Sequence, residues 1–195
     1  MIAAGLALAL RAQGVRVGVM KPVATGCLNF GKRLVSADAA FLMEAAENEY
    51  TGYSSPSRFK HGVAPSVAAE IEQKEVDLDQ IRKAYAALEK KYDFIIVEGI
   101  GGLMVPINPR YYVTDLIREF KLPVLVVSKP GIGTINHTLL TIDAARIRGL
   151  DVKGIVFNRV PRANLSLSEM SNPKVIFELT QIPVLGSLPE IEGLD

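Results

Sequence analysis

The sequence predicts an α/β domain with a mostly parallel sheet and helices on both faces of that sheet. Five short aliphatic runs are nearly continuous rather than alternating with polar residues, which is the pattern of parallel strands covered on both sides. Segments of helical composition separate these runs in regular order, as in βαβ units. The chain has 195 residues, which suits one hydrophobic core, so we expect a single domain over residues 1–195.

The expected elements follow from local composition along the chain. Strands are expected at residues 15–20, 94–97, 124–128, 154–158 and 184–188, and helices at residues 2–13, 36–46, 77–92, 134–148 and near 173–181. Gly14 and Gly149 follow two of these helices, as glycine commonly does at a helix C-terminus. Asp77 and Gln80 have the spacing of a capping box. Residues 51–66 form the least regular segment and are expected to be a functional loop.

Composition and charge argue against several classes of protein. With 22 Lys and Arg against 21 Asp and Glu, the net charge is +1, which does not indicate a nucleic-acid-binding surface. A single cysteine cannot form an internal disulfide, which fits a reducing, cytoplasmic setting, and with two histidines it cannot build a usual zinc site. The apolar residues 1–10 lack a basic start and are too short to span a bilayer, so we expect a buried helix and no membrane partner.

Ligands of open parallel α/β sheets bind beyond the carboxyl ends of the strands, so the residues after each strand are the candidates for function. Lys21 follows the first strand and precedes a turn that carries the hydroxyl of Thr25. A lysine there suits a site that handles negative charge, although a solvated lysine before an ordinary turn is the alternative. Glu98 closes the second strand and precedes Gly101 and Gly102. Such an acid can hold Mg²⁺ beside a phosphate, and the glycines let a ligand approach the backbone.

Weaker candidates lie at the other strand ends and helix starts. Asp38, in the first turn of the second helix, suits either a metal ion or the helix dipole. Residues 129–134 run through two glycines into a helix N-terminus, which suits either an anionic ligand or an ordinary capped loop. Asn158 can read a base edge with its amide, and Glu190 follows the last strand. Asp115 can be a ligand, but helix capping is the favoured interpretation.

Taken together, these motifs are more specific than any one of them. The chain contains KPVATG at 21–26, Ser36 with Asp38, VEGIGGLMVPI at 97–107, GTINHTLLT at 133–141, FNR at 157–159 and IPVLGSLP at 182–189. In this order and spacing the set resembles the dethiobiotin synthetase family of P-loop NTPases over almost the whole chain. The runs around Glu98 and Asn136 are the most distinctive.

The resemblance implies an enzyme that uses ATP and Mg²⁺ to close the ureido ring of dethiobiotin from 7,8-diaminononanoate and CO₂. It implies a cytoplasmic homodimer that binds neither nucleic acid nor membrane. By motif match, Lys21 would stabilise charge on the carbamate and the transferred phosphoryl group, and Thr25 would hydrogen-bond the carbamate. Asp38 and Glu98 would hold Mg²⁺. The other implied residues contact the acceptor substrate (Gly101, Gly102, Gly133, Thr134, Ile135 and Asn136) or ATP (Asn158, Arg159, Pro189, Glu190 and Ile191).

One part of the family pattern is missing from these residues. No GxxxxGK[ST] run occurs, and residues 1–14 look like the helix that follows such a phosphate-binding loop. We therefore expect a truncated chain that lacks the first strand and the P-loop, ends early after Pro189 and has impaired activity. Two alternatives stay open: a P-loop-less, non-catalytic binding or regulatory domain, and an amide-forming enzyme of the cobyrinic acid synthase type.

Overall fold

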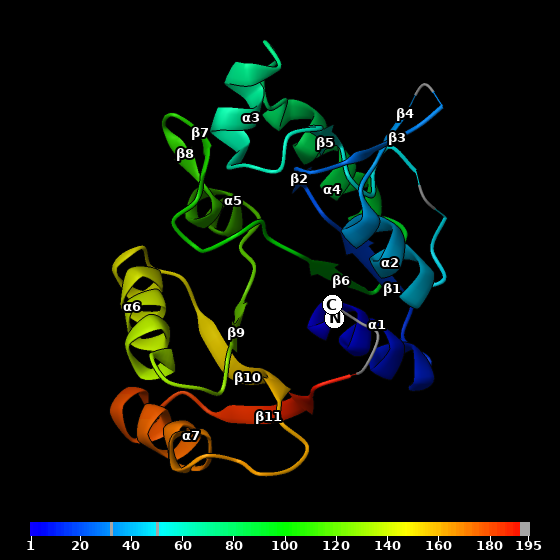
Figure 1. Cartoon of the computed structure of the whole chain (residues 1–195). Helices are drawn as coiled ribbons and strands as arrows, with labels where there is room; N and C mark the ends of the chain where they lie inside the picture. The colour runs from blue at the N-terminus through cyan, green and yellow to red at the C-terminus, as the bar shows by residue number, and fades with distance from the viewer. Residues whose placement is uncertain (32, 50, 192–195) are drawn as a thin grey trace. The chain divides into compact units, whose positions relative to one another are not determined.

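The computed structural model describes residues 1–31, 33–49 and 51–191. The chain forms two compact units, Met1–Val113 and Thr114–Asp195, whose elements are labelled in Figure 1. The predicted α/β class with parallel strands is confirmed in both units. Among the described residues, the long parallel ladders belong to two sheets, one in each unit.

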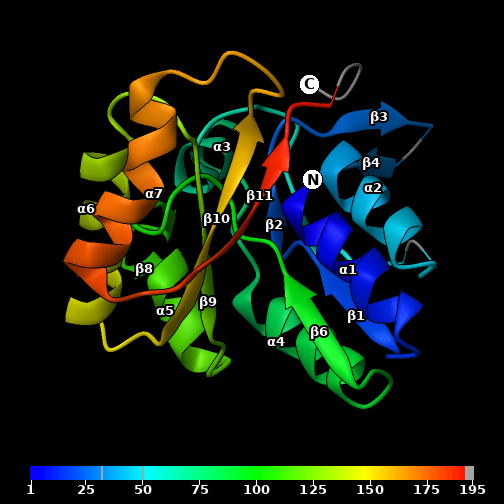
Figure 2. The ribbon, with the colours of Figure 1, turned by 90° about the horizontal axis from the view of Figure 1, so that it is seen from below.

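The sheet of the first unit is a parallel pair of short strands. Strand β1 (Val17–Met20) pairs with β6 (Phe94–Val97) in continuous register from Val17↔Phe94 to Met20↔Val97. Helices α1 (Ile2–Ala12) and α2 (Ala37–Ala45) cover one face, where Val17 and Val19 join their alanines, Leu42 and Met43 in the core. Helix α4 (Leu78–Glu89) lies toward the other face (Figure 2).

Glycine is required where α4 leads back into the sheet. The ring of Tyr92, just after α4, lies so close to Gly18 that a Cβ there would come within 2.5 Å of it. Because Gly18 alternates with Val17 and Val19 along β1, its empty side faces away from α1 and α2. The helices of the first unit therefore cover both faces of the pair, as the sequence predicts.

Two helix ends follow the predicted local chemistry. The Asp77 side chain accepts a hydrogen bond from the Gln80 amide at 2.8 Å, so the predicted cap of α4 is confirmed. Gly14 follows the end of α1 with φ of +83°, a conformation that glycine adopts without the steric cost of a Cβ. The expected ranges of α1, α2 and α4 were one, two and four residues too long, as is usual at frayed ends.

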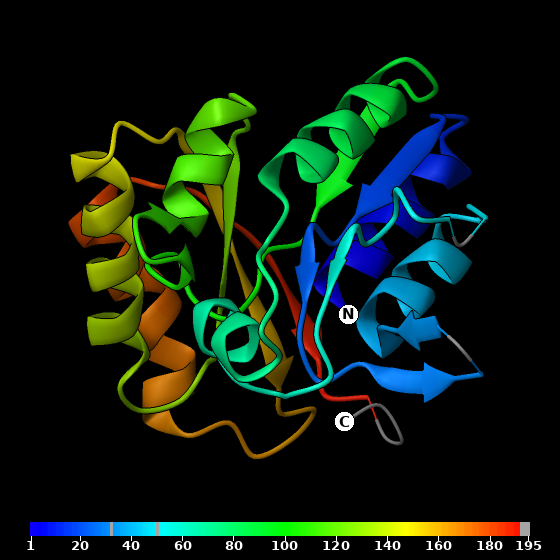
Figure 3. The same ribbon diagram turned by 90° about the horizontal axis from the view of Figure 1, so that it is seen from above.

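The remaining elements of the first unit are short. They are β2 (Val23–Ala24), β3 (Leu28–Phe30), β4 (Arg33–Val35), β5 (Ser57–Arg58), α3 (Pro65–Ile71), β7 (Pro106–Asn108) and β8 (Tyr111–Tyr112). Strands β2 and β5 pair in parallel and lie side by side in Figure 3. Residues 51–66, expected to be the least regular segment, include the two-residue strand β5 and the start of α3. Pro65 occupies the first turn of α3, where its missing N–H costs nothing.

The second unit is a three-stranded parallel sheet with two helices on one face. The strand order is β11 (Val184–Pro189), β10 (Val152–Val160), β9 (Val124–Ser128). Helices α6 (Thr134–Ile147) and α7 (Leu167–Thr180) pack on it through a core of Val126, Ile142, Ile155, Phe157, Ile176 and Ile182. Helix α5 (Val113–Glu119) lies in the sequence at the division between the units.

The last predicted helix is present and ends close to its expected end, but it begins earlier than the expected residue 173. Helix α7 begins at Leu167, where Ser166 and Glu169 form a complete capping box, and Pro173 lies inside the helix. A helix near residues 173–181 was expected, and a proline inside a helix interrupts the backbone ladder. The reciprocal cap at Ser166 and the buried Asn172 and Ile176 outweigh that cost. None of the helices among the described residues is long and apolar enough to cross a bilayer.

Candidate active site

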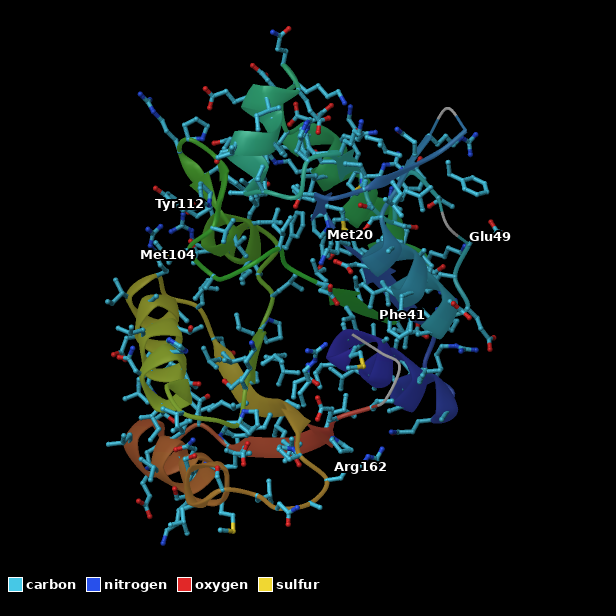
Figure 4. The ribbon with its side chains drawn as sticks, viewed as in Figure 1. Met20, Phe41, Glu49, Met104, Tyr112 and Arg162 are labelled. Carbon is cyan, nitrogen blue, oxygen red and sulfur yellow. The ribbon has the colours of Figure 1, made fainter. Side chains whose placement is uncertain are left out.

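Lys21 is the centre of the candidate site in the first unit. Its Nζ lies 2.7 Å from Glu98 Oε1 and 3.0 Å from Asp38 Oδ2, and it donates to the Gly99 carbonyl at 3.2 Å. Lys21 is only 6% exposed and directly follows Met20, a fully buried residue labelled in Figure 4. An ammonium group has three donors, so each of them has an acceptor here. The structure thus brings together three predicted site residues from three different elements.

The parallel ladder explains why Lys21 and Glu98 meet. The Glu98 amide donates to the Met20 carbonyl at 2.8 Å, which continues the β1–β6 pairing beyond the last registered pair. Both residues therefore leave the sheet at the same edge, as expected for carboxyl ends of parallel strands. The third group, Asp38, comes from the first turn of α2, where the Ser36 hydroxyl accepts from the Ala39 amide and fixes the helix start.

The two carboxylates of this cluster stabilise the charged form of Lys21. Burial lowers the pKa of Lys21, but the carboxylates of Glu98 and Asp38 outweigh burial, so the net effect is a raised pKa. The lysine is therefore held as an ammonium ion. The cluster combines one positive with two negative groups, and the side chains of Asp38 and Glu98 are 66% and 29% exposed. Both carboxylate side chains are thus partly open to solvent.

Thr25 lies on a turn held by backbone pairing. Strand β2 places Ala24 beside Arg58, and the Gly26 amide donates to the His61 carbonyl at 3.2 Å. Gly26 has φ of +71°, so glycine relieves the strain of this turn. Thr25, between these two anchored residues, is half-buried.

The glycines after Glu98 have a local explanation in part. Gly101 has φ of +62°, and a Cβ there would lie 2.9 Å from a Val105 methyl group. The Val105 amide closes a turn onto the Gly102 carbonyl at 3.0 Å. Gly102 is exposed, with open space where a side chain would stand. Turn geometry therefore accounts for Gly101, whereas the open space at Gly102 is compatible with an approaching ligand.

In the second unit, the loop before α6 follows the exposed Lys129 and presents backbone groups next to the helix. Gly133, with φ of +90°, precedes the helix, and no described side chain caps it. Ile135 is half-buried and Asn136 is exposed. Three buried hydroxyl groups near the loop form a chain: Thr138 Oγ1 lies 2.8 Å from Ser128 Oγ and 3.4 Å from Thr134 Oγ1. A helix N-terminus of this kind can bind an anion through its free amides.

A buried amide that sequence reasoning missed holds the same loop. Asn172 of α7 donates from Nδ2 to the Pro130 carbonyl at 2.8 Å and to the Gly131 carbonyl at 3.3 Å. Asn172 is 5% exposed, and a buried amide needs such partners. Its neighbour Pro173 obscured the signal, because the helix was expected to start there.

The predicted nucleotide-binding residues lie together at the carboxyl ends of β10 and β11. Asn158 pairs with Leu188, and its Oδ1 accepts from the Arg159 amide at 3.0 Å. Arg159 has φ of +57° and forms an irregularity in the ladder before Val160 pairs with Pro189. Glu190, just after β11, is hydrogen-bonded to the end of β10 and the residues after it. Its amide donates to the Val160 carbonyl, and Arg162, labelled in Figure 4, donates to the Glu190 carbonyl. Ile191 follows as the last described residue.

Comparison with known proteins identifies the family. A family model described as an AAA domain matches residues 1–195. The ATP-dependent dethiobiotin synthetase BioD of Thermodesulfovibrio yellowstonii is 41% identical over 191 residues, which cover 94% of this chain and 80% of that protein. The chain belongs to the dethiobiotin synthetase family. The enzyme of the same name from Bacillus licheniformis is 38% identical over 192 residues, with 98% and 80% covered.

Membership of the dethiobiotin synthetase family agrees with the motif set, and the enzyme class of this family is an ATP-dependent ligase. Among solved structures, the ParA family ATPase of Chlorobium tepidum has a TM-score of 0.55 at 17% identity, over 98% of this chain and 79% of that one. This likeness supports the P-loop NTPase-like α/β fold alone.

Proposed function

We propose that the protein is a dethiobiotin synthetase, which closes the ring of 7,8-diaminononanoate with CO₂ at the expense of ATP, with Mg²⁺ as cofactor. The observation that carries this proposal is the buried Lys21 between Asp38 and Glu98. Phosphoryl transfer depends chiefly on positioning and on neutralising charge, and these three groups supply both. The same three residues argue against the alternative of a non-catalytic binding domain.

The proposed reaction has three bond-forming steps. One amine of the substrate takes up CO₂ and loses a proton, which gives a carbamate. A carbamate oxygen then attacks the γ-phosphorus of ATP, the bond to the β-phosphate oxygen breaks, and ADP leaves. The second amine attacks the carbonyl carbon of this mixed anhydride, loses a proton and expels inorganic phosphate as the ring closes.

Lys21 would stabilise the negative charge of the carbamate and of the transferred phosphoryl group. All three of its donors already have acceptors, so one must exchange when the substrates bind. The Gly99 carbonyl is the most distant of these acceptors, at 3.2 Å, and is neutral. We expect that contact to be released first, while both carboxylates hold the ammonium in place. Thr25 would donate its hydroxyl to a carbamate oxygen.

Asp38 and Glu98 fit the needs of Mg²⁺. This ion usually takes one or two protein carboxylates and completes its shell with phosphate oxygens and water. Each carboxylate contacts Lys21 through one oxygen and has a second one. Within the described residues no group of three or more acids, histidines or cysteines could hold a metal ion, which suits a metal that nucleotide phosphates share. When bound, Mg²⁺ would supply positive charge to those phosphates.

The other predicted residues receive binding roles. The amides of Gly133, Thr134, Ile135 and Asn136 at the start of α6 would bind the carboxylate of the substrate, in a homodimer. Gly101 and Gly102 would also bind the substrate. Asn158 and Arg159 would contact adenine, together with Pro189, Glu190 and Ile191. The 195 residues hold no GxxxxGK[ST] run, so we expect low ATP turnover from residues 1–195 assayed by themselves. We place the enzyme in the cytoplasm.

The test is product formation by the full-length protein. Labelled bicarbonate is supplied with 7,8-diaminononanoate, ATP and Mg²⁺, and labelled dethiobiotin is measured. We expect label in the product only when all components are present, with one ADP formed per product. Absence of labelled product from folded protein under these conditions would exclude the proposed function.

A further inference from the structure

Glu72 lies outside the site residues considered so far, yet it is among the most heavily bonded side chains of the first unit. It directly follows α3, and its side chain is only 8% exposed. Its Oε1 accepts from the amides of Lys60 at 2.6 Å and His61 at 3.1 Å and lies 3.0 Å from His61 Nδ1, while Oε2 pairs with Lys74 at 2.8 Å. A carboxylate with so many donors fixes the backbone that it binds.

The electrostatics agree with this geometry. Burial raises the pKa of Glu72, but the hydrogen bonds from Lys74, from the His61 ring and from the two amides outweigh burial and lower the pKa to about 2. The group is therefore a carboxylate at every pH at which an enzyme of this kind works. Its bonds to Lys60 and His61 are charge-assisted bonds, about twice as strong as those of a neutral acceptor.

The segment that Glu72 binds is the pairing partner of the Thr25 turn. The Phe59 amide donates to the Ala24 carbonyl at 2.9 Å, and the Cys27 amide donates to the Phe59 carbonyl at 3.0 Å. The Gly26 amide donates to the His61 carbonyl at 3.2 Å. Phe59 is 1% exposed and anchors this segment in the core. Residues 57–61 thus run along residues 23–27 on both sides of Thr25, and Glu72 holds the outer end of that strip.

We propose that Glu72 is a positioning residue for the acceptor-substrate site, which acts by fixing the segment 59–61 and, through it, the turn that carries Thr25. This role rests on the proposed function, since it concerns the residue assigned to the carbamate. Displacement of a substrate-positioning group by about 1 Å can cost about 10²-fold in rate. Loss of the Glu72 anchor acts on that turn and leaves the Lys21, Asp38 and Glu98 cluster in place.

The test compares Glu72→Ala and Glu72→Gln in the full-length protein with Glu70→Gln as the matched control. Glu70 is an exposed acid of α3. The Glu70→Gln substitution removes the same charge as Glu72→Gln, two residues earlier in the chain. We expect Glu72→Ala to raise the KM for 7,8-diaminononanoate about tenfold or more while the KM for ATP is unchanged. Glu72→Gln keeps an oxygen acceptor for the two amides and is expected to fall between Glu72→Ala and the wild-type protein.

A merely structural role gives a different pattern: fewer active molecules, a lower kcat and unchanged KM values for both substrates. That result, or a Glu72→Ala variant that matches Glu70→Gln, would overturn the proposal. Hydrogen exchange distinguishes this failure from failure of the proposed function. If the wild-type protein makes no dethiobiotin, Glu72→Ala is still expected to accelerate exchange of the Gly26 and Cys27 amides at least tenfold relative to those of β6. Unchanged exchange there overturns the positioning role, whatever the reaction is.

Discussion

The candidate residues of the first unit are held together by charged side chains, whereas the loop before α6 in the second unit is held mainly by backbone groups, buried hydroxyls and a buried amide. Lys21 contacts two carboxylates directly, while the loop before α6 depends on the amide of Asn172 and on the chain of hydroxyls around Thr138. Direct charge contacts act strongly on a reacting phosphate, but backbone loops bind and orient. Substitutions in the first unit should therefore affect catalysis most, and substitutions in the second should affect binding and stability.

The largest effect is expected for Glu98→Gln. The change removes a negative charge 2.7 Å from Lys21 and one proposed metal ligand, so kcat should fall about 10²–10³-fold. Single-turnover assays at saturating Mg²⁺ and ATP measure this effect. Glu75→Gln, at an exposed position of the same unit, is the control and should keep the wild-type rate. Equal rates for the two variants would remove Glu98 from the site.

Asp38→Asn is expected to have a smaller effect, because this side chain is 66% exposed and the ion pair is longer, at 3.0 Å. Loss of one charged contact costs about 1.5 kcal/mol, which is about tenfold in a dissociation constant. The Mg²⁺ concentration for half-maximal rate should rise accordingly, with kcat less affected than in Glu98→Gln. A Mg²⁺ titration of the rate shows whether Asp38 acts on the metal or only at the start of α2.

In the second unit, Asn172→Ala tests the expectation that contacts to the loop backbone affect binding and stability more than catalysis. It leaves the carbonyls of Pro130 and Gly131 without their buried donor, which costs about 1–3 kcal/mol of stability. Urea unfolding measures that loss. The KM for diaminononanoate should rise as the loop before α6 loosens, while single-turnover phosphoryl transfer at saturating substrate stays within a few fold of wild type. A large loss in that step would contradict the division of roles between the units.

The smallest effect is a pH dependence of stability that comes from Glu72. Its pKa is lowered in the folded protein from 4.5 to about 2, so its contribution to stability is complete above about pH 5 and is lost as the pH falls from 4.5 toward 2. Urea midpoints of the wild-type protein and Glu72→Gln should differ at pH 6 and converge toward pH 2. A difference that is constant over this range would show that the carboxylate has no special stability in the folded state.

The contrast between charged side chains and backbone contacts also explains which site residues could be predicted from the sequence. Lys21, Asp38 and Glu98 follow strands or begin a helix, where parallel topology brings side chains to one edge, and their charge makes them conspicuous. Strands β6 and β9 match their predicted bounds because both are continuous aliphatic runs. The roles of Glu72 and Asn172 were not predicted, because both bind backbone groups that lie 11 to 42 residues away in the sequence. Residue type alone does not reveal such contacts.

Helix ends and strands were predicted correctly where the signal in the neighbouring residues is strong. The cap of α4 and the glycine after α1 were correct because each depends on a few neighbouring residues. The start of α7 was wrong because the proline signal at Pro173 competes with a capping box that begins seven residues earlier, and tertiary burial of Asn172 and Ile176 decides between them. The two-residue strands β2 and β5 have no periodicity to detect. Their pairing depends on contacts between segments that are distant in sequence.

The central claim is that the buried Lys21, held by Asp38 and Glu98, stabilises the charge of phosphoryl transfer. The most direct measurement is kcat/KM for dethiobiotin formation by Lys21→Met in the full-length protein, with Lys91→Met as a control at an exposed lysine of the same unit. A fall of about 10²-fold or more is expected for Lys21→Met, with an unchanged rate for Lys91→Met. A folded Lys21→Met protein that makes dethiobiotin at the wild-type rate would contradict the claim.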